Sequence, residues 1–147
     1  MEESISGAED YLEQVFALEE KDWSQYSPLT LAYIGDAVYD MIVRTVLVRR
    51  ANTQTEKLHR QASALVKAEA QARVAAALQP CLSAQEQSVY RRGHNAKPYS
   101  TAKNASRRDY LEATGLEALI GYLYLKREYR RIIDLISRGM EECGYRL

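Results

Sequence analysis

The chain has 147 residues, of which 46% are apolar, so it is long and apolar enough to form one globular domain with its own core. This composition excludes a disordered chain, and no apolar run is long enough to cross a membrane. The acidic start, Met-Glu-Glu-Ser, is unlike a signal peptide, and Cys81 and Cys143 have no metal-ligand spacing, which together favour reduced thiols in a cytoplasmic protein.

The net charge of zero conceals a segregation of charge along the chain. Eight acids and one lysine precede residue 23, which gives this segment a net charge of −7. Six basic residues fall between Arg91 and Arg108 with no acid among them. Such a block is able to meet a polyanion, although a charge run is also compatible with a merely solvated surface.

The first predicted elements are an acidic extension over residues 1–22 and a long helix behind it. The extension has a weak helical pattern, and we expect a tail or a marginal helix outside a domain that covers residues 23–147. Ser27 and Pro28 are typical of an N-cap and a first helical position, and the helix should run to about Arg50. Its faces are nearly all apolar, so we expect it to be central and buried on most sides.

Two further helices are predicted in the middle of the chain. One should run from Thr55 to about Leu78, with one possible break inside it. Ser83 begins a capping-box pattern, so the next helix should start there and end near Gly93. The residues from 93 to 105 are polar and predict a loop.

The C-terminal third predicts two more helices. The first should begin at Ser106 and reach about Leu125, and the second should cover roughly Glu128 to Cys143, where Gly144 suits a helix end. No alternating strand pattern and no internal repeat is present. The predicted fold class is all-α.

Two acids stand alone in apolar helical segments. Asp36 lies in Leu-Ala-Tyr-Ile-Gly-Asp-Ala-Val-Tyr, and Glu117 lies in Leu-Glu-Ala-Leu-Ile-Gly-Tyr-Leu. A carboxylate taken out of water needs a cation or hydrogen-bond donors. Gly35 and Gly121 would let the two helices approach closely, which would bring both acids to one divalent metal ion. Spacing alone leaves open that each acid pairs with an arginine or caps a neighbouring helix.

A family resemblance bears on that choice. Tyr-Ile-Gly-Asp-Ala-Val at 33–38 and Glu-Ala-Leu-Ile-Gly at 117–121 resemble the two catalytic helices of the ribonuclease III family, and Arg-Arg-Gly-His-Asn-Ala-Lys at 91–97 lies between them. The resemblance extends from about Trp23 to Cys143. The chain looks like the branch of the family whose catalytic domain has no double-stranded-RNA-binding domain attached.

The resemblance implies a ribonuclease III-type helical bundle, a homodimer that cleaves double-stranded RNA with Mg²⁺. By position, Asp36 is the catalytic aspartate and Glu117 the metal-binding glutamate, and both are expected to be metal ligands. The family also implies 5′-phosphate and 3′-hydroxyl products and precursor 23S ribosomal RNA as the substrate. Ala32 and Thr114 stand where other members have further acids, so the number of metal ions and the full ligand set stay open.

The basic block supplies the candidate RNA-binding residues. They are Arg91, Arg92, His94, Asn95, Lys97, Lys103, Arg107 and Arg108. Side chains of these types contact phosphates, and duplex RNA is recognised largely by its shape and backbone. Tyrosines inside the helices, such as Tyr33 and Tyr39, are expected in the core rather than on an RNA-stacking surface.

Two other functions compete with an endonuclease. The first is a non-catalytic RNA- or ribosome-binding helical module that kept the fold, and the second is a helical protein-interaction domain. Neither has a use for two isolated acids, so the retention of both Asp36 and Glu117 favours the enzyme.

Overall fold

A computed structural model describes residues 2–96 and 106–147. These residues contain no strand, which confirms the all-α class. The elements are α1 (Glu2–Phe16), η1 (Trp23–Gln25), α2 (Pro28–Arg50), α3 (Thr55–Val66), α4 (Ala68–Leu78), η2 (Gln79–Cys81), α5 (Ala84–His94), α6 (Arg107–Leu125) and α7 (Tyr129–Glu142). No helix in this part of the chain has the length and hydropathy that a membrane-spanning segment needs.

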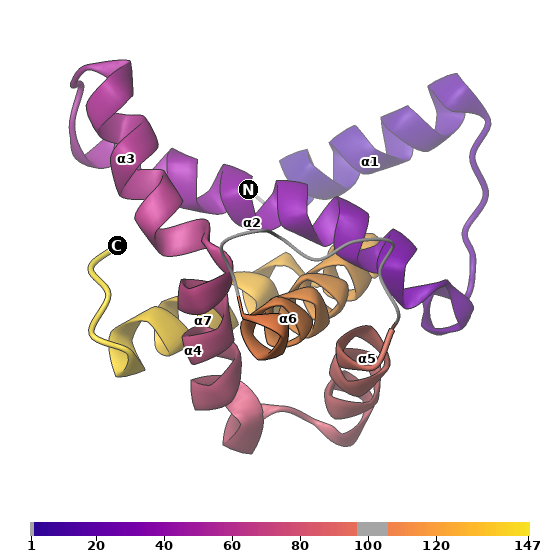
Figure 1. The fold of residues 1–147 in the computed structure, drawn as a ribbon. Helices are drawn as coiled ribbons and strands as arrows, with labels where there is room; N and C mark the ends of the chain where they lie inside the picture. Colours follow the sequence, from indigo (N-terminus) through magenta and orange to yellow (C-terminus); the bar gives the residue numbers. More distant parts are fainter. Residues whose placement is uncertain (1, 97–105) are drawn as a thin grey trace.

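The core is organised around α6, which lies in the middle of the molecule (Figure 1). Helix α2 crosses it along one side, α4 and α5 flank it, and α7 closes the remaining side. Ten of the nineteen residues of α6 are buried, as expected for a helix in the centre of a core. Side chains on α6 are therefore held rigidly from several directions.

The helix ends follow mostly from local chemistry. Ser83 and Glu86 form the predicted capping box at the start of α5, and Ser106 accepts a hydrogen bond from the backbone N–H of Asp109 at the start of α6. Ser27 occupies the N-cap position of α2 but makes no side-chain capping bond. The break expected between residues 55 and 78 falls at Lys67, whose extended backbone separates α3 from α4.

One expectation for α2 is wrong. The helix buries one side against the core, but Tyr33 is 84% exposed, and Met41 and Val48 are each 57% exposed. These three positions fall within one narrow arc of the helix, because they are separated by eight and seven residues. The helix therefore presents an apolar stripe to solvent, and Tyr33 is not a core residue.

Arg127 links helix α1 to the turn between α6 and α7. Arg127 forms ion pairs with Glu9 at 3.1 Å, Asp10 at 2.5 Å and Glu13 at 2.8 Å. These acids share one side of α1, while its apolar residues Tyr11, Leu12, Val15 and Phe16 are exposed. The acidic extension is thus a formed helix attached by charge, and its separation from a domain over residues 23–147 stays a prediction.

Candidate active site

The site begins with an unusually close crossing of α2 and α6. A Cβ added to Gly35 would overlap the backbone carbonyl oxygen of Glu117 and would stand 2.8 Å from the backbone nitrogen of Gly121. A Cβ on Gly121 would likewise overlap the carbonyl oxygen of Leu31. The two helix backbones touch at this point because neither glycine has a side chain. This confirms the close approach predicted from the small residues beside the two acids.

The crossing brings the carboxyl groups of Asp36 and Glu117 together. Glu117 is half-buried, and its pKa is raised from the usual 4.5 to about 9, chiefly by burial and then by a hydrogen bond and charge repulsion with Asp36. Asp36 itself is exposed and directly follows Gly35, the residue at the helix crossing. The sequence suggested two acids withdrawn from water, whereas the structure withdraws only Glu117.

Among the described residues, no cationic side chain balances the acid pair. Within the described residues, no Lys or Arg side chain forms an ion pair with Asp36 or Glu117. The neighbouring acid on the same helix, Asp40, pairs with Arg44 at 3.0 Å. Two adjacent carboxylates without a cation form an arrangement that a divalent ion would stabilise.

No third acid joins the pair in the described part of the chain, where three or more His, Cys, Asp or Glu side chains nowhere gather as a metal site. Thr114 is buried, and its hydroxyl donates to the Tyr110 carbonyl at 2.8 Å, so it does not face the site as a ligand. Ala32 is also buried and has no ligand atom. The residues present fit Mg²⁺, because this ion is usually held by only one or two carboxylates and keeps several waters.

Two buried polar atoms near Glu117 were not singled out from the sequence. The Gln71 side chain lies close to Glu117 and acts to lower the pKa of that carboxyl, against the larger increases from burial and Asp36. Gln71 Nε2 makes no hydrogen bond to the described residues. The hydroxyl of Tyr39 is also buried without a partner, and the nearby Glu117 charge adds to the effect of burial in raising its pKa. For Gln71, the only indication in the sequence was a polar residue on the apolar face of an alanine-rich helix.

The basic residues of α5 differ in whether their side chains already bind other parts of the protein. Arg92 donates to the backbone carbonyls of Ser24 at 2.5 Å and Tyr26 at 2.9 Å, so it braces α5 against the segment before α2. Arg91 is exposed. His94 is half-buried, with its ring 6.0 Å from the Tyr90 ring. An RNA-binding role for Arg92 would require it to leave two backbone acceptors.

The remaining candidates lie beyond α5 and at the start of α6. Asn95 Oδ1 lies 3.1 Å from His94 Nδ1. Arg107 is exposed, and Arg108 is exposed with an ion pair to Glu112 at 3.1 Å, so both start the helix that carries Glu117. Lys97 and Lys103 lie outside the described residues. The structure thus places basic side chains at the end of α5 and the start of α6, the helices that precede and follow residues 97–105.

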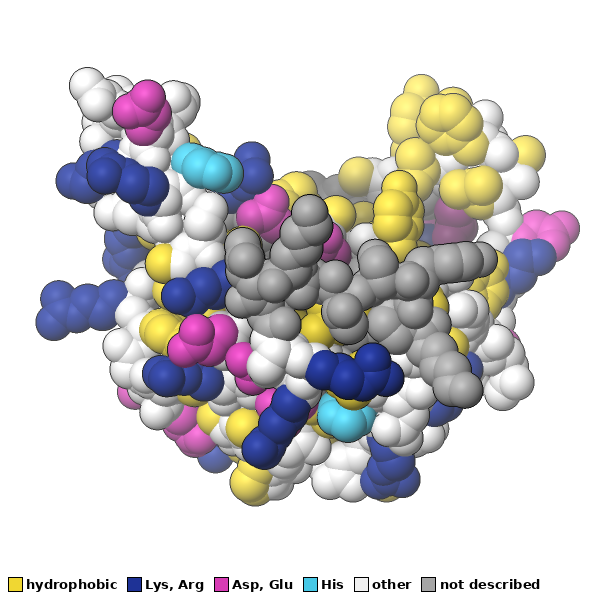
Figure 2. Space-filling view, viewed as in Figure 1, with side chains coloured by type: hydrophobic (Ala, Val, Ile, Leu, Met, Phe, Trp, Pro, Cys, Tyr) yellow, Lys and Arg dark blue, Asp and Glu magenta, His cyan; other side chains and the backbone are white. Residues whose placement is uncertain are grey.

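The space-filling view shows how the surface is divided (Figure 2). Hydrophobic side chains gather at the upper right, where Figure 1 places α1, and the Lys and Arg side chains lie in several groups over the left and lower parts. The exposed apolar residues of α1 are Tyr11, Leu12, Val15 and Phe16. The described cations therefore do not form one continuous band on this face.

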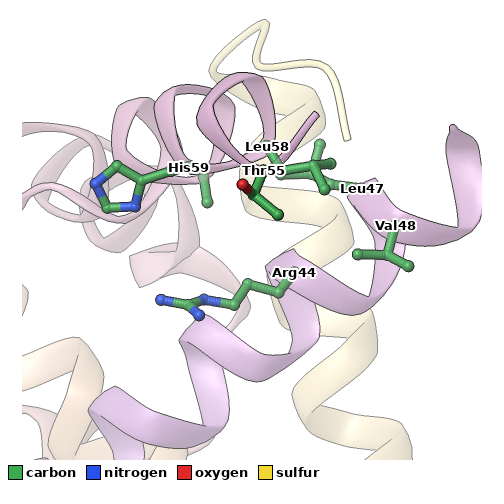
Figure 3. Close-up of a pocket in the computed structure, with 7 residues that line it drawn as sticks. Arg44, Leu47, Val48, Thr55, Leu58 and His59 are labelled. Carbon is green, nitrogen blue, oxygen red and sulfur yellow. The ribbon is translucent and has the colours of Figure 1, made fainter. Parts of the chain in front are cut away.

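A pocket of about 320 Å³ lies away from the acid pair, between α2 and α3 (Figure 3). Its lining is mainly apolar, from Leu47, Val48, Leu58 and Ala62, with Arg44, Thr55 and His59 completing it. No acid lines it, so it has no metal ligands of the kind found at the helix crossing. It shares Val48 and Arg44 with a groove along the exposed side of α2.

Comparison with known proteins agrees with this arrangement. The chain matches the Ribonuclease III domain over residues 29–128, a range that includes both acids, both crossing glycines and α3 to α6. The chain belongs to the ribonuclease III family. A crystal structure of a Fusobacterium nucleatum protein superposes with a TM-score of 0.73 and 26% identity, covering 80% of this chain and 94% of that one.

Curated relatives narrow the assignment. The Mini-ribonuclease 3 of Symbiobacterium thermophilum is 46% identical, over 78% of this chain and 88% of its own length. The corresponding protein of Thermoanaerobacter is 38% identical over 96% and 97%, and that of Clostridium tetani 43% identical over 80% and 78%. These relatives place the chain in the Mini-ribonuclease 3 branch and identify it as a ribonuclease III-type endoribonuclease.

Proposed function

We propose that this chain hydrolyses phosphodiester bonds of double-stranded RNA, with Asp36 and Glu117 as the catalytic acids and joint ligands of Mg²⁺. The observation that carries the proposal is the contact between these two carboxyl groups at the α2–α6 crossing, with no Lys or Arg of the described residues paired to either. Two carboxylates are a sufficient protein contribution to a hydrated Mg²⁺ site.

The chain's own residues contribute position and charge. Glu117 is held in place by the buried helix α6, whereas Asp36 is exposed on α2. The pair is therefore rigid on one side and accessible to RNA on the other. When bound, Mg²⁺ would supply an activated water and neutralise charge on the phosphate. Hydrolysis that breaks the bond between phosphorus and the 3′ oxygen would leave a 5′-phosphate and a 3′-hydroxyl.

The RNA is proposed to run across the basic ends of α5 and α6. Arg91 and Arg107 are exposed and have no partner among the described residues, while His94, Asn95 and Arg108 lie beside them. Lys97 and Lys103 belong to the same proposal. Contacts of this type bind phosphates irrespective of sequence, which suits a duplex substrate. The proposed natural substrate is precursor 23S ribosomal RNA in the cytoplasm.

A homodimer is proposed to form through α2. The exposed stripe of Tyr33, Met41 and Val48 is continuous with the α2–α3 pocket, which Val48 also lines. A second copy of the chain can cover the same stripe about a two-fold axis, because a symmetric interface uses one patch twice. No other part of the described protomer covers the side chains of this stripe.

Cleavage of long duplex RNA by the purified protein, with Mg²⁺ and then with chelator, tests the proposal. Asp36→Asn and Glu117→Gln should each remove cleavage while the helical circular dichroism spectrum is kept. Asp40→Asn is the matched control, since Asp40 lies one turn further along α2 and pairs with Arg44. Duplex binding without cleavage by the wild type in Mg²⁺ would instead establish the non-catalytic RNA-binding module.

A further inference from the structure

The buried face of α4 carries an amide where the helix pattern calls for an apolar residue. Gln71 is only 2% exposed, and the residues that follow it on the same face, Val74, Ala75 and Leu78, are all buried hydrophobics. A buried amide costs free energy when its hydrogen bonds are not satisfied, and an aliphatic side chain of similar length would avoid that cost. Packing of α4 alone therefore gives no reason for a glutamine here.

The amide is directed at the acid pair. The Gln71 amide lies close enough to Glu117 to favour its charged carboxylate, whereas burial and Asp36 oppose that form. Nε2 of Gln71 makes no hydrogen bond to the described residues, so this donor is available to Glu117. The Gln71 side chain thus reaches Glu117 from α4, while Asp36 reaches it from α2.

We propose that Gln71 is a positioning residue for the metal site: its amide donates to one oxygen of Glu117 and leaves the other oxygen turned toward Asp36. This inference rests on the proposed function, because it assigns Gln71 a task only if the two acids bind a metal ion. A neutral donor suits the task better than a cation, since Lys or Arg would compete with the metal for the same carboxylate. Groups that orient a ligand from behind commonly change metal affinity tenfold to a hundredfold when they are removed.

The buried hydroxyl of Tyr39 supports the same arrangement. It comes from α2, three residues after Asp36, and the Glu117 charge reaches it. Like Gln71 Nε2, it is buried without a hydrogen-bond partner. The Tyr39 hydroxyl is thus a second buried donor without a partner, on a different helix, and both Cys143 and Glu117 act on it.

Mn²⁺ binding to the intact protein, followed by electron paramagnetic resonance or calorimetry, tests this role without relying on cleavage. Gln71→Met keeps the length and volume of the side chain and removes the amide. We expect its Mn²⁺ dissociation constant to rise by about tenfold to a hundredfold. Its metal-free melting temperature should equal or exceed that of the wild type, since a poorly satisfied amide has been removed. Cleavage should recover as Mg²⁺ is raised, with the KM for RNA unchanged.

Gln79→Met is the matched control. The Gln79 amide, at the other end of the same helix, donates to the Ala75 carbonyl at 2.9 Å. This variant should lose some stability and bind Mn²⁺ like the wild type. Gln71→Asn, which keeps an amide but withdraws it by one methylene, should also weaken Mn²⁺ binding and serves if the methionine variant does not fold.

The outcomes separate the two proposals. Wild-type protein that binds no Mn²⁺ would overturn the metal site itself, and this inference with it. Wild-type protein that binds Mn²⁺ and loses it in Asp36→Asn, while the Gln71 variants bind as tightly as the wild type, would overturn the role of Gln71 alone. A lower melting temperature with unchanged affinity would show that Gln71 only supports the fold.

Discussion

Gly35 of α2 lies directly against the backbone carbonyl of Glu117 in α6, so the residue before one acid touches the main chain of the other. The distance between the two carboxyl groups is consequently set by backbone contact rather than by long flexible side chains. A site built in this way needs little reorganisation to hold a small ion. It also has no tolerance for a larger residue at the contact.

Gly35→Ala should therefore destabilise the protein and disrupt the acid pair together. The added Cβ meets backbone atoms, which cannot rotate away, so we expect a loss of about 3 kcal/mol or more in the free energy of unfolding. Chemical denaturation measures the loss. Gly7→Ala in α1 is the control, because a Cβ there meets nothing within 4 Å and should have a neutral or slightly stabilising effect. Equal stability of the two variants would contradict the close crossing.

The metal-free protein should lose stability as the pH rises from about 4.5 to about 9. Burial and Asp36 raise the pKa of Glu117 to about 9, so the folded chain keeps a proton that the unfolded chain releases near 4.5. A proton bound more tightly by the folded state favours folding at low pH, and this contribution disappears as Glu117 ionises. Thermal melts across this range in chelator measure the effect. Glu117→Gln should flatten the profile, and an unchanged slope in that variant would count against the shift.

Loss of two exposed arginines should weaken RNA binding in a salt-dependent way. The change Arg91→Ala with Arg107→Ala should lower duplex affinity most at low salt and reduce the slope of log affinity against log salt by about two, one for each phosphate contact. Arg73→Ala with Arg138→Ala removes the same charge from α4 and α7, outside the basic block, and should change the slope less. Equal slopes for the two double variants would place the RNA path elsewhere. Arg92 is left out, since it braces the fold.

Met41→Glu should separate the proposed dimer into folded protomers. Met41 lies in the exposed stripe of α2, and two copies of a carboxylate would face each other across a two-fold axis. Sedimentation velocity should give a dimer for the wild type and a monomer for the variant at micromolar concentration. Ile133→Glu is the control, because Ile133 is an exposed apolar residue of α7, outside that stripe. A wild-type monomer would overturn the interface.

Features encoded by neighbouring residues were predictable from the sequence, and features that depend on a distant partner were not. The capping box at Ser83 and the break between α3 and α4 follow from local patterns. The approach of α2 to α6 could be predicted because both acids have glycines nearby. In contrast, periodicity marks Tyr33 as apolar but does not distinguish a protomer core from a surface that another chain can cover. Gln71 looked like an ordinary polar residue of an alanine-rich helix until α6 was placed beside it.

The attachment of α1 has a consequence for how the molecule responds to its medium. Arg127 joins three acids of this helix, Glu9 also acts on Tyr124 and Tyr129, and no α1 side chain among residues 7–16 is buried. Partly exposed ion pairs weaken as ionic strength rises, whereas burial of apolar surface does not. Salt and heat should therefore act on different parts of the chain. We expect rising salt to release α1 while α2 to α7 stay folded. Amide hydrogen exchange in α1 should therefore accelerate at ionic strengths that leave α6 protected.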